Sequence, residues 1–185
     1  MKTNAKNNLL ILCESAIMIA LAAALGFFKI SLWAQGGSID LCMAPLFVLA
    51  YRRGAKVALP ACFAYGLIDC IVGGGIGWGL PSILLDYVLA YGVVGIAGFF
   101  RKMPFGLTLG VIAGSLARFA VHFVSGVTIY KIAVGTSVEL FGMTFDSSMA
   151  ALYSLVYNGS YMLGDCVLSL MAVLLLKKPL EKLPK

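Results

Sequence analysis

Residues 9–28 read LLILCESAIMIALAAALGFF, twenty residues in which Glu14 is the only charged side chain. A helix of about 20 apolar residues is long enough to cross the hydrocarbon core of a bilayer. Segments of the same character follow at 39–51, 54–72, 81–100, 107–130 and 148–176. We therefore expect an all-α integral membrane protein, with a single transmembrane domain over residues 1–185 built as a bundle of six transmembrane helices.

The composition agrees with a chain that lies almost entirely in the membrane. Of the 185 residues, 61% are hydrophobic and 12% are charged, and the mean hydropathy is +0.98. A soluble domain has an apolar content nearer about one half. No convincing cleavage site follows the first apolar segment, so we expect it to remain as a helix and not to be removed as a signal peptide.

The basic residues indicate how the bundle is oriented. With a cytoplasmic N-terminus, the inner loops and ends carry eleven of them: Lys2, Lys6, Arg52, Arg53, Lys56, Arg101, Lys102, Lys177, Lys178, Lys182 and Lys185. The outer connections then carry only Lys29 and Lys131. This excess predicts that both termini are cytoplasmic. The net charge of +6 forms clusters between apolar segments and no continuous stripe, so no nucleic-acid partner is expected.

Motifs of catalysis and metal binding do not occur in the sequence. There is no GxSxG, HExxH or Walker A motif, and there is a single histidine. We therefore expect neither an enzyme nor an ATPase site in this chain. The cysteines are Cys13, Cys42, Cys62, Cys70 and Cys166, an odd number without CxxC spacing. They predict no disulfide framework, no metal site and no cofactor.

Ionisable side chains inside the expected spans are the first candidates for function, because they are costly in a bilayer. They are Glu14, Asp69, Asp86, Arg118, His122 and Asp165. The assigned topology places Asp69 and Asp86 within about two turns of the outer face. His122 falls in the outer half of its helix, so these groups predict an outward-facing cavity. Arg118 is expected to neutralise an internal acid, either Asp165 or Asp69.

In the fourth segment, Asp86 and Tyr87 combine a carboxylate with an aromatic face, and Tyr91 follows four residues after Tyr87 on the same side. Such a pair would suit a cationic aromatic ligand. The alternative is that Asp86 forms a purely structural ion pair with His122 or Arg118. In that case the carboxylate would stabilise the bundle and contact no ligand.

In the fifth segment, His122, Gly126 and Tyr130 follow at intervals of four and share one helical face. Gly126 leaves a gap there into which a ligand could fit. The alternative is that Gly126 allows close helix packing and that His122 bonds across helices. In the sixth segment, Asn158 and Tyr153 are the polar candidates for reading the edge of a heterocycle. Tyr153 also forms a stripe with Tyr157 and Tyr161 at intervals of four. Such a stripe is typical of helix packing or interfacial anchoring.

In this order and at this spacing, the segments resemble a known family. The carriers are ESAIMIALA (14–22), PLFVLAYRRG (45–54), LDY (85–87), RFAVHFVSG (118–126) and YSLVYNG (153–159). Together they are similar to the substrate-binding S components of energy-coupling factor vitamin transporters, and among these to the thiamine-specific branch. The resemblance runs over nearly the whole chain.

The resemblance implies a membrane subunit that captures thiamine from the outer face with high affinity. It implies docking on a transmembrane coupling subunit and two cytoplasmic ATPase subunits, which alone use ATP, in a bacterial plasma membrane. Ala16, Ala20 and Ala24 correspond to a small-residue motif that faces the coupling subunit in this family. Small residues at that spacing let helices approach closely, which serves packing within the subunit equally well.

The resemblance also implies the positions of the substrate contacts. They are Asp86, Tyr87, His122, Gly126, Tyr130, Tyr153, Asn158 and Trp33. The chain departs from the better-known pattern, since Asp86 is the shorter acid, Tyr130 stands where tryptophan is usual, and the loop with Trp33 is about three residues longer. Another heterocyclic vitamin or a thiamine precursor is therefore an alternative ligand.

We expect the connections 29–38 and 131–147 to close over the bound ligand. A rival interpretation from another class is a small intramembrane enzyme that uses Asp69, Asp86 and His122 for acid–base work on a lipid or prenyl substrate. A third interpretation is an ion-coupled carrier that works alone. The binding interpretation is preferred because it also accounts for the aromatic residues and the amide.

Overall fold

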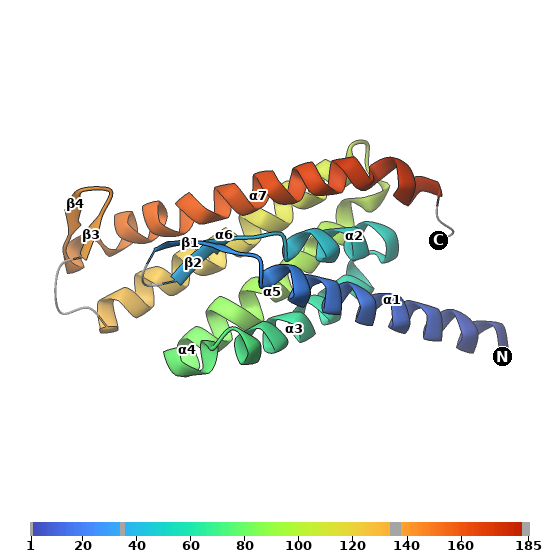
Figure 1. Cartoon of the computed structure of the whole chain (residues 1–185), viewed down its shortest axis with the longest axis horizontal. Helices are drawn as coiled ribbons and strands as arrows, with labels where there is room; N and C mark the ends of the chain where they lie inside the picture. The colour runs from blue at the N-terminus through green and yellow to red at the C-terminus, as the bar shows by residue number, and fades with distance from the viewer. Residues whose placement is uncertain (1, 34–35, 134–137, 183–185) are drawn as a thin grey trace.

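The structure is a computed structural model that describes residues 2–33, 36–133 and 138–182, without the side chains of 2–4, 36, 130–133, 138 and 147. Its longer helices are α1 (Lys2–Gly26), α2 (Met43–Arg53), α3 (Ala55–Val72), α6 (Gly106–Ala133) and α7 (Ala150–Lys182) (Figure 1). Between α3 and α6 lie η1 (Gly75–Trp78), α4 (Leu80–Ser82), η2 (Ile83–Leu89), α5 (Ala90–Gly92) and η3 (Val93–Lys102). Two antiparallel hairpins, β1 (Ile30–Trp33) with β2 (Gly36–Ile39) and β3 (Val138–Leu140) with β4 (Met143–Phe145), and the short η4 (Ser147–Met149) complete the chain.

Five helical segments of the described chain are long and apolar enough to cross a membrane. They are Ala5–Gly26, Ala55–Val72, Leu80–Lys102, Gly106–Ile129 and Ala150–Lys182. The sixth pass is α2, whose 11 residues rise about 16 Å, roughly half of a hydrocarbon core of about 30 Å. The expected all-α membrane bundle is thus confirmed, with one member of half length.

The short α2 forms the centre of the bundle. All eight residues from Met43 to Ala50 are buried, and α1, α3, η3, α6 and α7 pack around them. Helices of the protein, and not lipid, therefore surround α2. A helix that is enclosed in this way need not reach both faces of the bilayer, because its ends are covered by protein.

The observed helices differ from the expected segments at several ends, and two of these differences follow from local turns. The first segment was expected to reach residue 28, but α1 ends at Gly26 and the next two residues form tight backbone turns. The second was expected to begin at residue 39, but 39–42 lead out of β2. Oδ1 of Asp40 accepts the backbone N–H of Cys42 at 2.7 Å, a local turn of the kind that aspartate stabilises. The helix therefore begins only at Met43.

The pass Leu80–Lys102 is not a regular α-helix. Its outer part, η2, is a π-helix and its inner part, η3, is a 3-10 helix. In a 3-10 helix the side chains at i and i+3 lie directly above one another. Gly95 and Gly98 of η3 therefore lie one above the other, with Gly92 at the boundary just before η3, and a Cβ on any of the three would overlap atoms of α3. The glycine spacing matches the tighter winding and lets η3 lie against α3.

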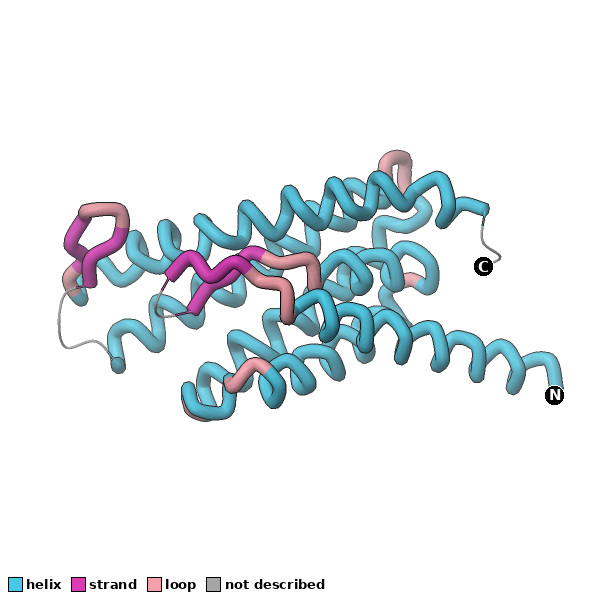
Figure 2. Tube along the Cα trace, in the orientation of Figure 1, coloured by secondary structure: helices cyan, strands magenta, loops and turns pink. Residues whose placement is uncertain are grey.

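The two ends of the bundle differ in composition. Both termini lie at the same end in Figure 1, where α2 ends in Arg52 and Arg53 and η3 ends in Arg101 and Lys102. Both hairpins lie toward the opposite end (Figure 2). By the excess of positive charge, the end with the termini is the cytoplasmic one. The hairpins are therefore external.

A turn leads from the second hairpin into α7. Oδ1 of Asp146 accepts the backbone N–H groups of Ser148 and Met149 at 2.8 and 3.2 Å. The hydrogen bond from the Ser148 hydroxyl holds the pKa of Asp146 below its usual value. The carboxylate thereby satisfies backbone donors at the start of η4, which would otherwise have no partner.

At the inner end, Glu14 of α1 meets the end of α2. Arg52 Nε donates to one carboxylate oxygen of Glu14, and Arg53 donates to the other, with an Nε–Oε2 distance of 2.6 Å. The three side chains are only 8–13% exposed. Arg101 adds a hydrogen bond of 3.2 Å from Nη1 to the carbonyl oxygen of Arg52. The carboxylate is thus balanced by permanent positive charges.

Candidate functional site

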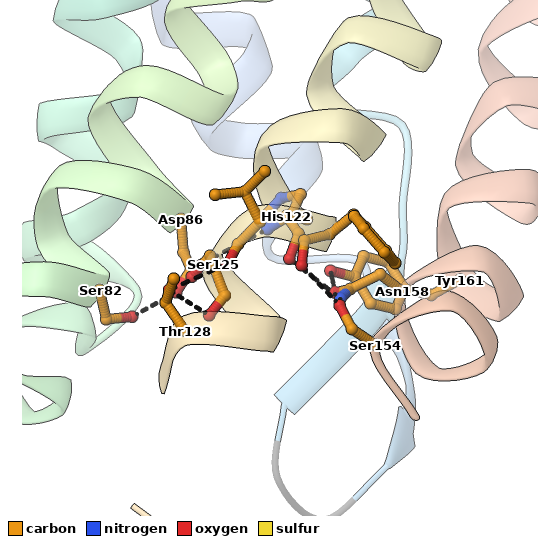
Figure 3. A network of polar contacts seen from close by, with 10 residues as sticks. Ser82, Asp86, His122, Ser125, Thr128, Ser154, Asn158 and Tyr161 are labelled. Carbon is orange, nitrogen blue, oxygen red and sulfur yellow. Dashed lines mark hydrogen bonds and ion pairs between the residues drawn. The ribbon is translucent and has the colours of Figure 1, made fainter. Parts of the chain in front are cut away.

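Asp86 stands on the π-helix η2 near the outer end and faces α6. Its Oδ2 accepts a hydrogen bond of 2.6 Å from Ser82 Oγ, and its Oδ1 lies 3.2 Å from His122 Nδ1 (Figure 3). The Asp86 side chain is 25% exposed, whereas that of His122 is 8% exposed. The structural alternative for Asp86, a contact with His122, is therefore present, and the carboxylate also stays within reach of a ligand. π-helical turns occur frequently at functional sites.

His122 has one engaged and one unengaged ring nitrogen. An ionised carboxylate only accepts hydrogen bonds, so the contact with Asp86 places the proton on Nδ1. In the neutral ring, Nε2 then carries a lone pair. Nε2 is buried and has no hydrogen-bond partner among the described residues. A buried polar atom without a partner is costly, so this nitrogen is suited to accept an N–H group from a ligand.

The amide of Asn158 is held between α6 and α7. Its Nδ2 donates to the backbone oxygen of His122 at 3.1 Å and to Ser154 Oγ at 3.0 Å, and its Oδ1 accepts the Tyr161 hydroxyl at 2.7 Å (Figure 3). Both amide hydrogens are thus engaged. A carbonyl oxygen accepts two hydrogen bonds, so one acceptor position on Oδ1 remains for a ligand.

Gly126 is a point of close helix packing. A Cβ at this position would overlap the Ser154 hydroxyl and would lie 2.9 Å from Asn158 Nδ2. The packing alternative for Gly126 is therefore what the structure shows: the glycine brings α6 against α7. Through that approach it positions His122 and Asn158 relative to one another.

Aromatic rings line the outer half of α7. Tyr153 and Tyr157 are stacked, with centroids 5.4 Å apart and planes at 12°, and Tyr161 meets Tyr157 edge-on at 5.7 Å. Tyr161 in turn lies 6.0 Å from the ring of His122. Trp33 of β1 joins this row at 6.4 Å from Tyr157. The rings form one continuous wall that leads from the external surface to His122.

Two expected contacts are placed differently or fall outside the description. The ring of Tyr87 packs against Gly75 in the loop after α3, where a Cβ would overlap it. Tyr87 is thus directed toward η1, whereas its neighbour Asp86 faces α6. The side chain of Tyr130 lies outside the described residues.

Sequence reasoning missed two contributors to this region, Ser82 and Ser154. Ser82 gave a weak signal, because it precedes Asp86 by one helical turn. Ser154 gave none, since its bond to the Phe123 oxygen at 2.8 Å depends on helix packing. Phe141, in the 131–147 connection that was expected to close over the ligand, contacts Trp33 edge-on with ring centroids 4.7 Å apart. Within the described residues, no cluster of His, Cys, Asp and Glu is able to hold a metal ion.

Comparison with known proteins decides the family. The sequence model of the family described as thiamine transporter protein matches residues 12–185. The chain belongs to the thiamine transporter family. The thiamine transporter ThiT of Bacillus subtilis is 30% identical over 190 residues, which cover 94% of this chain and 93% of that protein. ThiT of Lacticaseibacillus paracasei is 29% identical over 183 residues, with 89% and 85% covered.

A solved structure extends the likeness of this thiamine transporter family member to the fold. ThiT from Listeria monocytogenes superposes with a TM-score of 0.79 at 27% identity, covering 94% of this chain and 96% of that one. The resemblance to the thiamine-specific branch is therefore confirmed. Bacterial relatives and five long apolar helices identify a multi-pass protein of the bacterial plasma membrane. Its family is one of transporters.

Proposed function

We propose that this protein captures thiamine at its external end and delivers it as the S component of an ATP-driven energy-coupling factor importer. The observation that carries the proposal is a partly exposed carboxylate, Asp86, beside a buried histidine nitrogen without a partner, at the inner end of an aromatic wall. Thiamine combines a thiazolium cation with an aminopyrimidine. Both parts find complementary chemistry in this arrangement.

The cation would bind near Asp86. A charge-assisted contact contributes about 1.5–3 kcal/mol, and each aromatic face adds about 0.5–2 kcal/mol. Tyr153, Tyr157 and Trp33 supply the aromatic faces. Gly126 contributes by holding α6 against α7, while Tyr87 and Tyr130 remain proposed contacts on the strength of the family resemblance.

The aminopyrimidine would be read by hydrogen bonds. The lone pair on His122 Nε2 would accept an N–H of the 4-amino group. The remaining acceptor position on Asn158 Oδ1 would take a second donor. Because the other polar atoms of Asn158 are engaged within the protein, its contribution includes holding the site in shape.

Oxythiamine provides the sharpest test, because an oxo group replaces the 4-amino group of thiamine. Isothermal titration of the detergent-purified protein should give saturable binding of thiamine and at least about tenfold weaker binding of oxythiamine. In the variant His122→Ala the difference should nearly vanish. An undiminished preference in that variant would contradict the role of His122. If folded wild-type protein did not bind thiamine, thiamine would not be the ligand. Titration with a panel of other heterocyclic vitamins would then follow.

The proposed partners are a transmembrane coupling subunit and two ATPases, for which the surface of α1 supplies support. Ala16, Ala20 and Ala24 are exposed on α1, whereas Ala22 is fully buried. The three alanines therefore take little part in packing within the subunit. A groove of about 520 Å³ runs beside Ala16 between α1 and α3. A row of small residues next to a groove suits the close approach of a partner helix.

A further inference from the structure

The first hairpin rests on α7 through β2 and the last residue of β1. Trp33 Nε1 donates to Ser160 Oγ at 3.0 Å, and Gly37, with a φ of 73°, lies so close to Tyr161 that a Cβ would come within 2.8 Å of the ring. At Gly164 a Cβ would come within 2.5 Å of the Ile39 side chain. The residues of α7 at 160, 161 and 164 thus form a seat for the hairpin.

The stem of this hairpin ends on one buried carboxylate. Asp165 is 1% exposed and lies near the middle of α7. Its Oδ1 accepts the backbone N–H of Asp40, the residue after β2, at 2.9 Å. Its Oδ2 is 3.4 Å from Nη1 of Arg118 on α6. The guanidinium of Arg118 also lies 4.0 Å from the centre of the Tyr91 ring, a cation–π contact that helps to hold it.

We propose that Asp165, held by Arg118, is a positioning residue that anchors the stem of the first hairpin and thereby sets how long the bound ligand is retained. Neither side chain contacts the proposed ligand groups. Asp165 would act on the ligand site through the hairpin and through Tyr161. The ring of Tyr161 touches Gly37, and its hydroxyl donates to Asn158. This inference rests on the proposed function for its ligand and on the structure alone for the anchor.

The chemistry explains why an anchor should use a charged pair. The N–H of Asp40 points into the bundle at membrane depth, where a backbone donor without a partner costs several kcal/mol. A carboxylate satisfies it more strongly than a neutral acceptor would. Burial of the carboxylate requires a countercharge, and Arg118 supplies it. The pair is therefore tied to the hairpin stem as well as to the packing of α6 on α7.

Hydrogen–deuterium exchange of the detergent-purified protein, without thiamine, tests the anchor directly. Amides of 37–41 should exchange at least tenfold faster in Asp165→Leu, and less so in Asp165→Asn, which keeps an acceptor oxygen. The double variant Arg118→Met/Asp165→Leu removes the countercharge together with the acid. The double variant should be more stable to thermal unfolding than Asp165→Leu, because no charge is left unpaired. The amides of 37–41 should still exchange fast, because the Asp40 N–H lacks its acceptor. Ser169→Ala, one turn along α7, is the matched control and should change neither the exchange of 37–41 nor the stability.

Stopped-flow measurement of thiamine release should show a koff about tenfold higher in the anchor variants, with kon nearly unchanged. If Asp165→Leu does not fold, Gly164→Ala displaces Ile39 from its seat without altering a charge and should have the same effect. Wild-type exchange rates in a folded anchor variant would overturn the proposal. Fast exchange in the variants combined with no thiamine binding by the wild type would support the anchor and refute the ligand.

Discussion

The two ends of this bundle each hold a membrane-embedded carboxylate, and the two are neutralised in different ways. Glu14 at the inner end binds two arginines, Arg52 and Arg53, which stay charged under all conditions. Asp86 at the outer end binds a serine and a histidine. Glu14 is thus fully compensated, whereas Asp86 keeps capacity for a cation. The difference teaches that the partners of an intramembrane acid, more than its depth, distinguish a structural acid from a binding one.

The largest effect on stability is expected from Glu14→Ala. Two arginines, each about one tenth exposed, would lose their countercharge, which costs about 3–5 kcal/mol for a buried pair. Thermal unfolding in detergent should show a marked fall in Tm. The thiamine affinity of the protein that remains folded should be that of the wild type. If Glu14→Ala lost more free energy of thiamine binding than free energy of unfolding, the distinction between the two ends would be wrong.

The converse result is expected from Asp86→Asn. This change keeps the size and removes the charge, so the affinity for thiamine should fall about 10- to 100-fold, as the loss of a charged contact of about 1.5–3 kcal/mol implies. The Tm should change little, because the side chain is 25% exposed. Titration calorimetry measures the affinity, and Ser82→Ala should show a smaller loss. If the affinity for thiamine were unchanged in Asp86→Asn, Asp86 would be a structural acid like Glu14.

An intermediate effect is expected from Gly126→Ala. The added methyl would overlap the Ser154 hydroxyl and push α6 from α7, at about 1–3 kcal/mol of stability. Thiamine affinity should fall with it, because His122 and Asn158 separate. Gly159→Ala is the matched control: its Cβ would meet only an ordinary contact at 3.9 Å. Equal effects of the two changes, measured by unfolding and by titration, would argue against a role for close packing at Gly126.

The smallest effect on the isolated chain is expected from Ala20→Leu. The residue is exposed on α1, so both Tm and thiamine affinity should stay at the wild-type values. Co-purification with the proposed coupling subunit and ATPases should be lost, because the added side chain blocks close approach of a helix. Ala120→Leu makes the same change at an exposed position of α6 and should retain the complex. If both variants still co-purified with the complex, the docking surface would not lie on α1.

The sequence predicted the parts of this structure that depend on hydropathy and charge. The apolar segments indicated the bundle, and the basic residues indicated its orientation. Arg118 was expected to neutralise either Asp165 or Asp69, and its contact of 3.4 Å is with Asp165. These inferences succeeded because a bilayer penalises polar groups so strongly that few arrangements remain.

Other features were beyond a pattern-based prediction. The strands are three or four residues long, and β2 contains two glycines, so neither alternation nor β-propensity marks them. Over seven residues a π-helix has no periodicity distinguishable from that of an α-helix, so the turn that aims Asp86 at α6 stayed hidden. The engaged amide of Asn158 depends on how closely Gly126 brings two helices together, which only the packed structure reveals.

The enclosed α2 has a consequence for the permeability of the membrane. From Met43 to Ala50 its side chains are all apolar and buried at the inner half of the bundle. Such a column holds no polar groups along which water or ions could line up. The isolated protein should therefore keep the bilayer sealed even while its outer end admits a solute. A bacterium could display many copies of it without discharging the ion gradients across its plasma membrane.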